Sequence, residues 1–261
     1  MNKFTQFLIS LLIISISFNL QAGAADEVNT NSDDFETTIY EDEIYDPLED
    51  INRAIFSFNN VADRIILEPA AKGYKKLPPP VQSGLGNFIN NLKLPLVAIN
   101  QLLQGQGKNA IESTGRFVVN STVGIFGLID VADNIGLEQK QEDFGQTLAT
   151  WGVGDGFYIV LPLFGPSNIR DTTGMFMTMV SDPVNAYAVN QGEGWAIPLR
   201  TAVNAVDQRS QIIDEVNALR DNSVDYYAAV RSSYYQNRKA AIMNTDDNIL
   251  TPLPLISIEF E

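Results

Sequence analysis

The segment Gly152–Asp171, with the sequence GVGDGFYIVLPLFGPSNIRD, restricts the possible folds of this chain more than any other. Its apolar run from Phe157 to Phe164 contains Pro162 and is bordered on both sides by glycine or proline. Central strands exclude proline from their middle, and regular helices do not carry glycine and proline at this density. We therefore expect an irregular apolar loop or hairpin. It either lies on something apolar, such as a lipid, a membrane or a partner protein, or is a buried connection packed on its own domain.

The chain of 261 residues contains neither cysteine nor histidine. A Ser-His-Asp triad, a Cys-His dyad and an ordinary zinc site therefore cannot form, and acid–base chemistry would be left to carboxylates, lysine or tyrosine. Disulfides are excluded too, so packing must hold the fold. There is also no lipobox cysteine, so an N-terminal lipid cannot be attached. These absences argue against most hydrolases.

The formal net charge of the chain is −15 at pH 7. A chain this acidic is not expected to bind nucleic acid, because that requires lysine and arginine to neutralise phosphates. A basic partner, or a membrane approached through apolar contacts, remains compatible with this charge.

Motifs that would carry chemistry are weak. Adjacent carboxylates occur at Glu49/Asp50, Glu142/Asp143 and Asp246/Asp247. Neighbouring positions on a helix do not face each other, so these pairs do not predict catalysis. The segment Gly152–Gly156 resembles half of a phosphate loop, but no Gly-Lys-Ser/Thr follows it, and no calcium loop is present. We expect no catalytic residues, no metal and no cofactor.

Both ends of the chain are predicted to lie outside the folded domain. Lys3 and the short apolar run Phe7–Phe18 precede small residues, which predicts a signal peptide at 1–24, cut after Ala22 or Ala24. An uncleaved anchor is the alternative, although the run is short for a membrane span. Residues 25–45 are acidic and are expected to be a disordered linker, or else a docking strip for a basic partner. The acidic residues 244–261 form a second expected disordered tail.

Residues 46–243 are predicted to form one mainly helical domain of many short amphipathic helices. Asp46, as an N-cap followed by Pro47, predicts a first helix that ends before Pro69. Periodic apolar residues predict further helices at 81–92, 95–103, 108–122, 142–151, 171–180 and 198–219. A last helix is expected from Ser223, where tyrosines form either an interfacial belt or the helix's core face. After the signal no stretch could span a membrane, yet several are very apolar, which favours helices and loops in a bilayer interface.

Five blocks of sequence, in this order, resemble the MlaA/VacJ family. They are DPLEDINR at 46–53, LQG at 103–105, GRFVVNSTVGIFGLIDVAD at 115–133, FGQTLATWGVGDGFYIVLPLFGPSNIRD at 144–171 and YYAAVRSSYYQNR at 226–238. The resemblance covers nearly the whole predicted domain. It implies a helical ring, in the inner leaflet of the outer membrane, that carries an apolar hairpin and a central amphipathic channel.

The resemblance also implies a function without covalent chemistry. Mislocalised phospholipid would leave the outer leaflet of the outer membrane through the channel and pass to a periplasmic lipid carrier, which maintains lipid asymmetry. A trimeric porin would be a further partner. Family members are often lipoproteins, whereas this chain has no cysteine. Attachment to the periplasmic side of the outer membrane would then come from the ring's apolar perimeter or from the porin, and a soluble periplasmic pool is also expected.

Particular residues match the family's motifs. The residues that match the family's hinged, gating hairpin are Gly152, Gly154, Gly156, Tyr158, Leu161 and Phe164. The residues that match the family's opening signature, in the block at 46–53, are Asp46, Pro47, Leu48, Asn52 and Arg53. Ile55 and Phe58 fall where the family's channel-proximal helix lies.

Two other function classes remain open from the residues alone. The first is an acidic surface or envelope protein that binds other proteins, or has a structural role, in virulence or cell spreading. The second is a phospholipase that uses carboxylates, which the absence of histidine disfavours.

Overall fold

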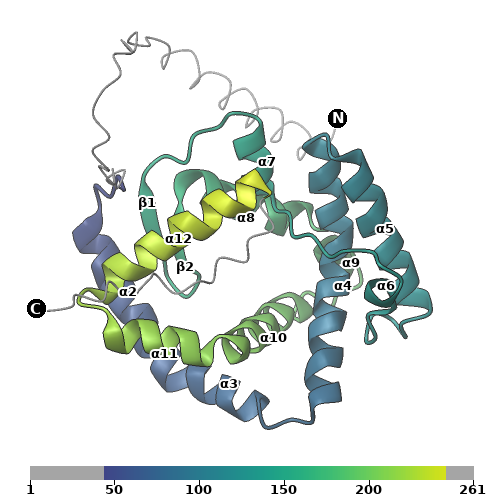
Figure 1. Ribbon diagram of the computed structural model, residues 1–261, viewed down its shortest axis with the longest axis horizontal. Coiled ribbons are helices and arrows are strands. Elements are labelled where there is room, and N and C mark those ends of the chain that lie inside the picture. Colours follow the sequence, from purple (N-terminus) through teal and green to yellow (C-terminus); the bar gives the residue numbers. More distant parts are fainter. Residues whose placement is uncertain (1–43, 245–261) are drawn as a thin grey trace, which may run out of the picture. The chain divides into compact units, whose positions relative to one another are not determined.

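The computed structural model describes residues 44–244 of the chain. Within these residues the protein is mainly helical, with a single two-stranded sheet, as expected (Figure 1). The predicted signal peptide at 1–24 lies outside the described residues. So do the predicted linker and tail, except for Ile44, Tyr45 and Asn244.

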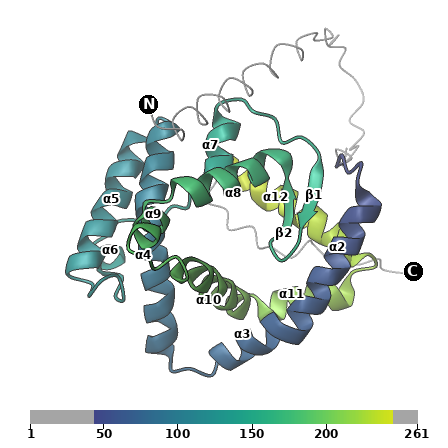
Figure 2. The same cartoon turned by 180° about the vertical axis from the view of Figure 1, so that it is seen from behind.

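In the first half of the described chain, all regular elements are helices. Its elements are α2 (Glu49–Ala62), the π-helical turn η2 (Asp63–Leu67), α3 (Glu68–Tyr74), α4 (Pro79–Leu103), α5 (Gly107–Thr122), α6 (Val131–Asn134) and α7 (Phe144–Thr150). In both views α2 and α3 form one side of this part of the molecule, and α4 rises from the loop after α3 to form another (Figures 1 and 2). The long helix α4 packs along α5.

The second half begins with the hairpin that the sequence predicts. Its elements are β1 (Tyr158–Leu161), β2 (Gly165–Asn168), α8 (Ile169–Ser181), α9 (Pro183–Asn190), α10 (Ala196–Gln211), α11 (Ile213–Asn222) and α12 (Tyr226–Met243). The strands are antiparallel, with Tyr158 opposite Asn168 and Leu161 opposite Gly165. Pro162 therefore lies in the turn, where it interrupts no ladder hydrogen bond. The hairpin contacts α2 and α12, α7 crosses α8, and α3 packs on α10.

The first helix differs from the prediction at its start. It begins at Glu49, and Asp46 does not cap it. The Asp46 carboxylate instead accepts hydrogen bonds from Asn52 at 2.7 Å, from Arg231 at 2.8 Å and from the Tyr227 hydroxyl. Two of these partners come from α12, nearly two hundred residues away, and local spacing could not reveal them.

The first helix also continues where the sequence predicts an end. Pro69 lies in the first turn of α3, directly after the π-helical turn, where a proline is tolerated. The predicted break between 92 and 95 is wrong as well, because Pro95 lies inside the 25-residue helix α4. Tertiary packing along α5 there offsets the cost of a proline inside a helix.

The helix predicted at 198–219 is divided at Ile212 into α10 and α11. The break lets an arginine from each part, Arg209 and Arg220, reach the same carboxylate of Asp63 at 2.8 and 2.7 Å. The last helix starts at Tyr226 instead of Ser223, and its cap is Asp225, whose carboxylate accepts from the backbone of Ala228. Helix α9 was not predicted.

Candidate functional site

The apolar hairpin is docked on α2 through side-chain amides. The Asn52 amide nitrogen donates to the Tyr158 carbonyl at 3.1 Å, and the Val160 backbone nitrogen donates to the Asn52 Oδ1 at 2.9 Å. One side chain thus hydrogen-bonds with the outer edge of β1 as a neighbouring strand would. The Tyr158 nitrogen is also paired, because it donates to the Tyr45 carbonyl at 3.0 Å.

A second asparagine repeats the arrangement near the hairpin turn. Asn59 donates to the Leu161 carbonyl at 2.9 Å and accepts from the Leu163 nitrogen at 2.7 Å. Asn52 and Asn59 are seven residues apart, two helical turns, and therefore lie on one face of α2. We call this pair the asparagine clamp.

The predicted hairpin residues fall into different environments. Tyr158 is fully buried and packs with Val160 and Tyr227 in an aromatic core cluster. Leu161 is half-buried, whereas Leu163 is 73% and Phe164 56% exposed. The base of the hairpin therefore belongs to the core, and its tip presents apolar side chains outside it.

The three predicted glycines also differ. Gly152 adopts a left-handed backbone with φ of +84°, which favours glycine, and a Cβ there would meet no atom within 4 Å. A Cβ on Gly154 would also lie in open space. Gly156 combines φ of +72° with a close approach, since its Cβ would lie 3.0 Å from the Cβ of Ile169. The surroundings of Gly152 and Gly154 are thus open, and those of Gly156 are not.

The opening signature ties α2 to the start of α12. Arg53 pairs with Asp225 at 2.6 Å and with Glu49 at 2.7 Å, and its guanidinium lies 4.4 Å from the ring centre of Tyr227. Burial and the neighbouring Asp46 carboxylate raise the pKa of Tyr227. Pro47 and Leu48 form the exposed turn before the helix. Asp46, Asn52 and Arg53 thus join α2 to β1 and α12 in the described conformation.

The two residues of α2 that are predicted to lie near a channel differ in exposure. Ile55 packs against the aromatic core cluster, whereas Phe58 is 55% exposed. Exposed apolar side chains recur along α2 and η2 at Leu48, Ile51, Phe58, Val61, Ile65 and Ile66. One side of this helix holds the hairpin, and another presents an apolar stripe.

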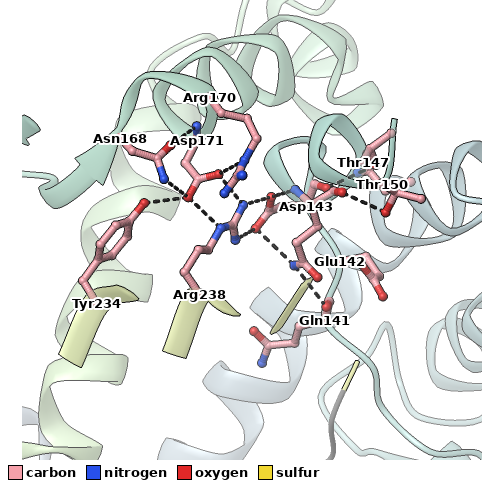
Figure 3. A network of polar contacts seen from close by, with 12 residues as sticks. Gln141, Glu142, Asp143, Thr147, Thr150, Asn168, Arg170, Asp171, Tyr234 and Arg238 are labelled. Carbon is pink, nitrogen blue, oxygen red and sulfur yellow. Dashed lines mark hydrogen bonds and ion pairs between the residues drawn. The ribbon is translucent and has the colours of Figure 1, made fainter. Parts of the chain in front are cut away.

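A second polar network, which the sequence did not suggest, joins α12 to α7 and α8 (Figure 3). Arg238 binds Asp143 through two hydrogen bonds of 2.6 and 2.8 Å, and its Nη2 donates to Asp171 at 2.9 Å. Tyr234 donates to Asp171 at 2.6 Å. Asp143 also caps α7 by accepting from the Gln146 backbone. One arginine thus connects the starts of two helices.

The adjacent carboxylates of Glu142 and Asp143 lie in two separate environments. Burial raises the pKa of Glu142, which accepts a hydrogen bond from Gln104 at 2.9 Å. Burial would also raise the pKa of Asp143, but the hydrogen bond and charge of Arg238 outweigh it and lower this pKa. Within residues 44–244, no group of histidine, cysteine, aspartate or glutamate is arranged to hold a metal ion.

The described part of the protein buries many polar side chains and exposes many large apolar ones. Among the described residues, buried polar or charged side chains outnumber buried apolar ones, and large apolar side chains are exposed on most helices. A folded domain in water ordinarily limits exposed apolar patches, so a surface of this kind marks an interaction site. Among the helices of residues 44–244, none is both long enough and apolar enough to cross a bilayer.

Comparison with known proteins gives consistent matches. Residues 44–241 match the family model described as MlaA lipoprotein. The intermembrane phospholipid transport system lipoprotein MlaA of Haemophilus influenzae is 40% identical over 199 residues, covering 74% of this chain and 77% of the relative. An uncharacterized protein of Rickettsia bellii is 39% identical over 202 residues, covering 77% of this chain and 78% of the relative.

A solved structure supports the same assignment. It is described as the structural basis for maintenance of bacterial outer membrane lipid asymmetry, and it superposes with a TM-score of 0.68 at 35% sequence identity. The match covers 76% of this chain and 98% of the solved chain. Together with the family model and the relatives, this similarity confirms the resemblance seen in the sequence: the chain belongs to the MlaA lipoprotein family.

Proposed function

We propose that this protein removes mislocalised phospholipid from the outer leaflet of the outer membrane, without covalent chemistry. The lipid would pass through an amphipathic channel to a periplasmic lipid carrier. Membership of a family whose named members belong to an intermembrane phospholipid transport system supports this proposal. A trimeric porin is the proposed neighbour in the membrane.

The observation that carries the proposal is the hairpin. Its apolar tip, Leu163 and Phe164, is exposed, while its edge is held by polar bonds to α2. The two bonds of Asn59, to Leu161 and Leu163, can open without disrupting the core cluster around Tyr158, because neither residue belongs to that cluster. The hairpin tip is therefore the proposed gate and Asn59 its latch, while Asn52 holds the hairpin base on the core.

The proposed hinge lies before β1. A Cβ on Gly152 or Gly154 would meet no atom within 4 Å, and glycine tolerates the changes of backbone angle that a hinge needs. The hydrogen bonds that would open are those from the Gly152 and Val153 nitrogens to the end of α7. Gly156 is excluded as a freely moving hinge, because it packs against Ile169.

The exposed apolar perimeter supports residence at the membrane. The chain has no cysteine to carry a lipid and is strongly acidic, so apolar contact is the proposed source of attachment to the periplasmic side of the outer membrane. At about 25 cal/mol per Å², burial of the exposed side chains on several helices would hold the protein there.

The test is complementation of a Gram-negative strain that lacks its own family member. Gly154→Val and Gly152→Pro should stiffen the hinge, raise phospholipid on the cell surface and lower detergent resistance. Gly194→Val and Gly192→Pro are matched controls. Gly194 has the open surroundings of Gly154, and Gly192 the positive φ and open surroundings of Gly152. Normal surface phospholipid in both hinge variants, at equal protein levels, would contradict the gate.

A further inference from the structure

The loop between α5 and α6 contains two strained residues in succession. Ile125 has φ of 54° and Phe126 φ of 58°, in the left-handed region that side chains other than those of glycine, asparagine and aspartate seldom adopt. For a β-branched residue such as isoleucine, this conformation is an outlier. Strain of this kind persists only where the surrounding structure imposes it.

The strained residues present their side chains outward. Phe126 is 76% and Ile125 55% exposed, and Val123, Leu128 and Ile129 are exposed as well. In the sequence no charged residue lies between Arg116 and Asp130. Residues 123–129, which we call the apolar loop, therefore form a charge-free, exposed turn.

The charged residues on either side of this loop, Arg116 and Asp130, pair with each other. Arg116 is buried, and its Nη2 pairs with the Asp130 carboxylate at 2.6 Å. Asn120 donates to the other oxygen of Asp130 at 2.9 Å. Asp130 thus pairs with buried groups of α5, so the outer surface of the loop stays apolar.

Hydrogen bonds and close contacts, within the loop and with α4, hold the backbone of the apolar loop. The Ile129 nitrogen donates to the Gly124 carbonyl at 2.9 Å, and a Cβ on Gly124 would lie 2.1 Å from the Ile129 carbonyl oxygen. A Cβ on Gly127 would lie 2.6 Å from the side chain of Asn91 in α4. The Leu128 carbonyl accepts from Asn87 at 3.2 Å. The fold thus holds Ile125 and Phe126 outward in spite of their strain.

We propose that the apolar loop is a rigid wedge that inserts into the acyl-chain region of a lipid bilayer. The exposed apolar surface continues onto α5 through Ile111 and Val118, which lie seven residues apart on one face. A chain with net charge −15 and no cysteine must approach lipid through apolar contacts, and this loop offers them without a charge to desolvate. The inference rests on the proposed residence at the membrane, but not on the proposed passage of lipid.

The first test places a fluorescent probe in the loop. Because the chain has no cysteine, Phe126→Cys gives the full-length protein one labelling site for an environment-sensitive dye such as nitrobenzoxadiazole. With vesicles of phosphatidylethanolamine and phosphatidylcholine, we expect a blue shift, at least a twofold rise in emission, and quenching by spin-labelled acyl chains. Val224→Cys, fully exposed between α11 and α12, is the control and should show none of these. An unchanged probe at 126, or equal responses at both positions, would overturn the wedge.

The second test separates strain from binding. Phe126→Gly relieves the unfavourable φ and removes the exposed ring, so the Tm should stay equal or rise, while binding to the same vesicles should fall about tenfold or more. Val224→Gly should leave vesicle binding unchanged. Wild-type binding retained by Phe126→Gly would overturn the wedge and leave membrane residence standing. No vesicle binding by the wild-type protein would overturn both.

Discussion

Asn52 and Asn59 lie two turns apart on α2 and hydrogen-bond with β1 and with the turn that follows it. Each uses both its amide nitrogen and its amide oxygen, so that one face of a helix replaces the missing neighbour strand. The hairpin, which has only two strands, is stabilised by this helix.

The clamp predicts two different mutational effects. Asn52 is buried, so Asn52→Ala leaves the Val160 nitrogen and the Tyr158 carbonyl unpaired and should cost about 2 kcal/mol in the free energy of unfolding. Asn59→Ala, nearer the solvent, should cost about 1 kcal/mol and speed hydrogen exchange at the Leu163 amide. Denaturant unfolding and hydrogen exchange measure both.

The control for this pair is Asn222→Ala, which removes an exposed bond to a helix carbonyl and should change stability little. Equal exchange at the Leu163 amide in Asn59→Ala and the wild type would contradict the clamp.

The arginine network predicts a large effect at one residue. Arg238→Met removes both hydrogen bonds to Asp143 and one of the two arginines that pair with the buried Asp171, because Arg170 stays 3.0 Å from it. We expect the free energy of unfolding to fall by about 2 kcal/mol in thermal or denaturant unfolding. Lys239→Met, at the neighbouring position, is the control. A loss below about 1 kcal/mol in Arg238→Met would show that the network does not hold α12 to α7 and α8.

Glu142 predicts a pH dependence. Burial raises the pKa of Glu142 in the folded state above its unfolded value, so the folded protein binds the proton more tightly than the unfolded chain does. The protonated carboxyl therefore adds to the free energy of unfolding at low pH, and this contribution is lost as the pH rises through the folded pKa. Glu142→Gln removes the buried charge and keeps an oxygen that accepts from Gln104. The variant's Tm should therefore exceed that of the wild type at pH 7, with a smaller difference at pH 4. A Tm difference that is larger at pH 4 would contradict this account.

Two helical glycines predict opposite results. A Cβ on Gly174 would lie 2.4 Å from the backbone nitrogen of Gly145, where α8 crosses α7, so Gly174→Ala must move a helix. We expect a loss of about 3 kcal/mol. A Cβ on Gly84 in α4 meets its nearest atom at 3.7 Å, and Gly84→Ala should stabilise by about 0.5 kcal/mol through helix propensity. Thermal unfolding of both variants checks the pair, and tolerance of Gly174→Ala would show that the helices can separate there.

The sequence by itself determined the features that depend on local backbone chemistry. Pro162 and the surrounding glycines predicted the hairpin, because they are incompatible with longer regular elements. Apolar periodicity predicted the helical class and α5 nearly to the residue. The five sequence blocks predicted the family, which the comparisons confirm.

Only the tertiary structure decided how the helices start, continue and break. Asp46 bonds to α12 instead of capping α2, Pro69 and Pro95 lie within helical segments, and Ile212 divides a helix whose two halves share Asp63. The physical reason is the same in each case. A local preference is worth about 1 to 3 kcal/mol, and buried charges or packed helices distant in the sequence outweigh it.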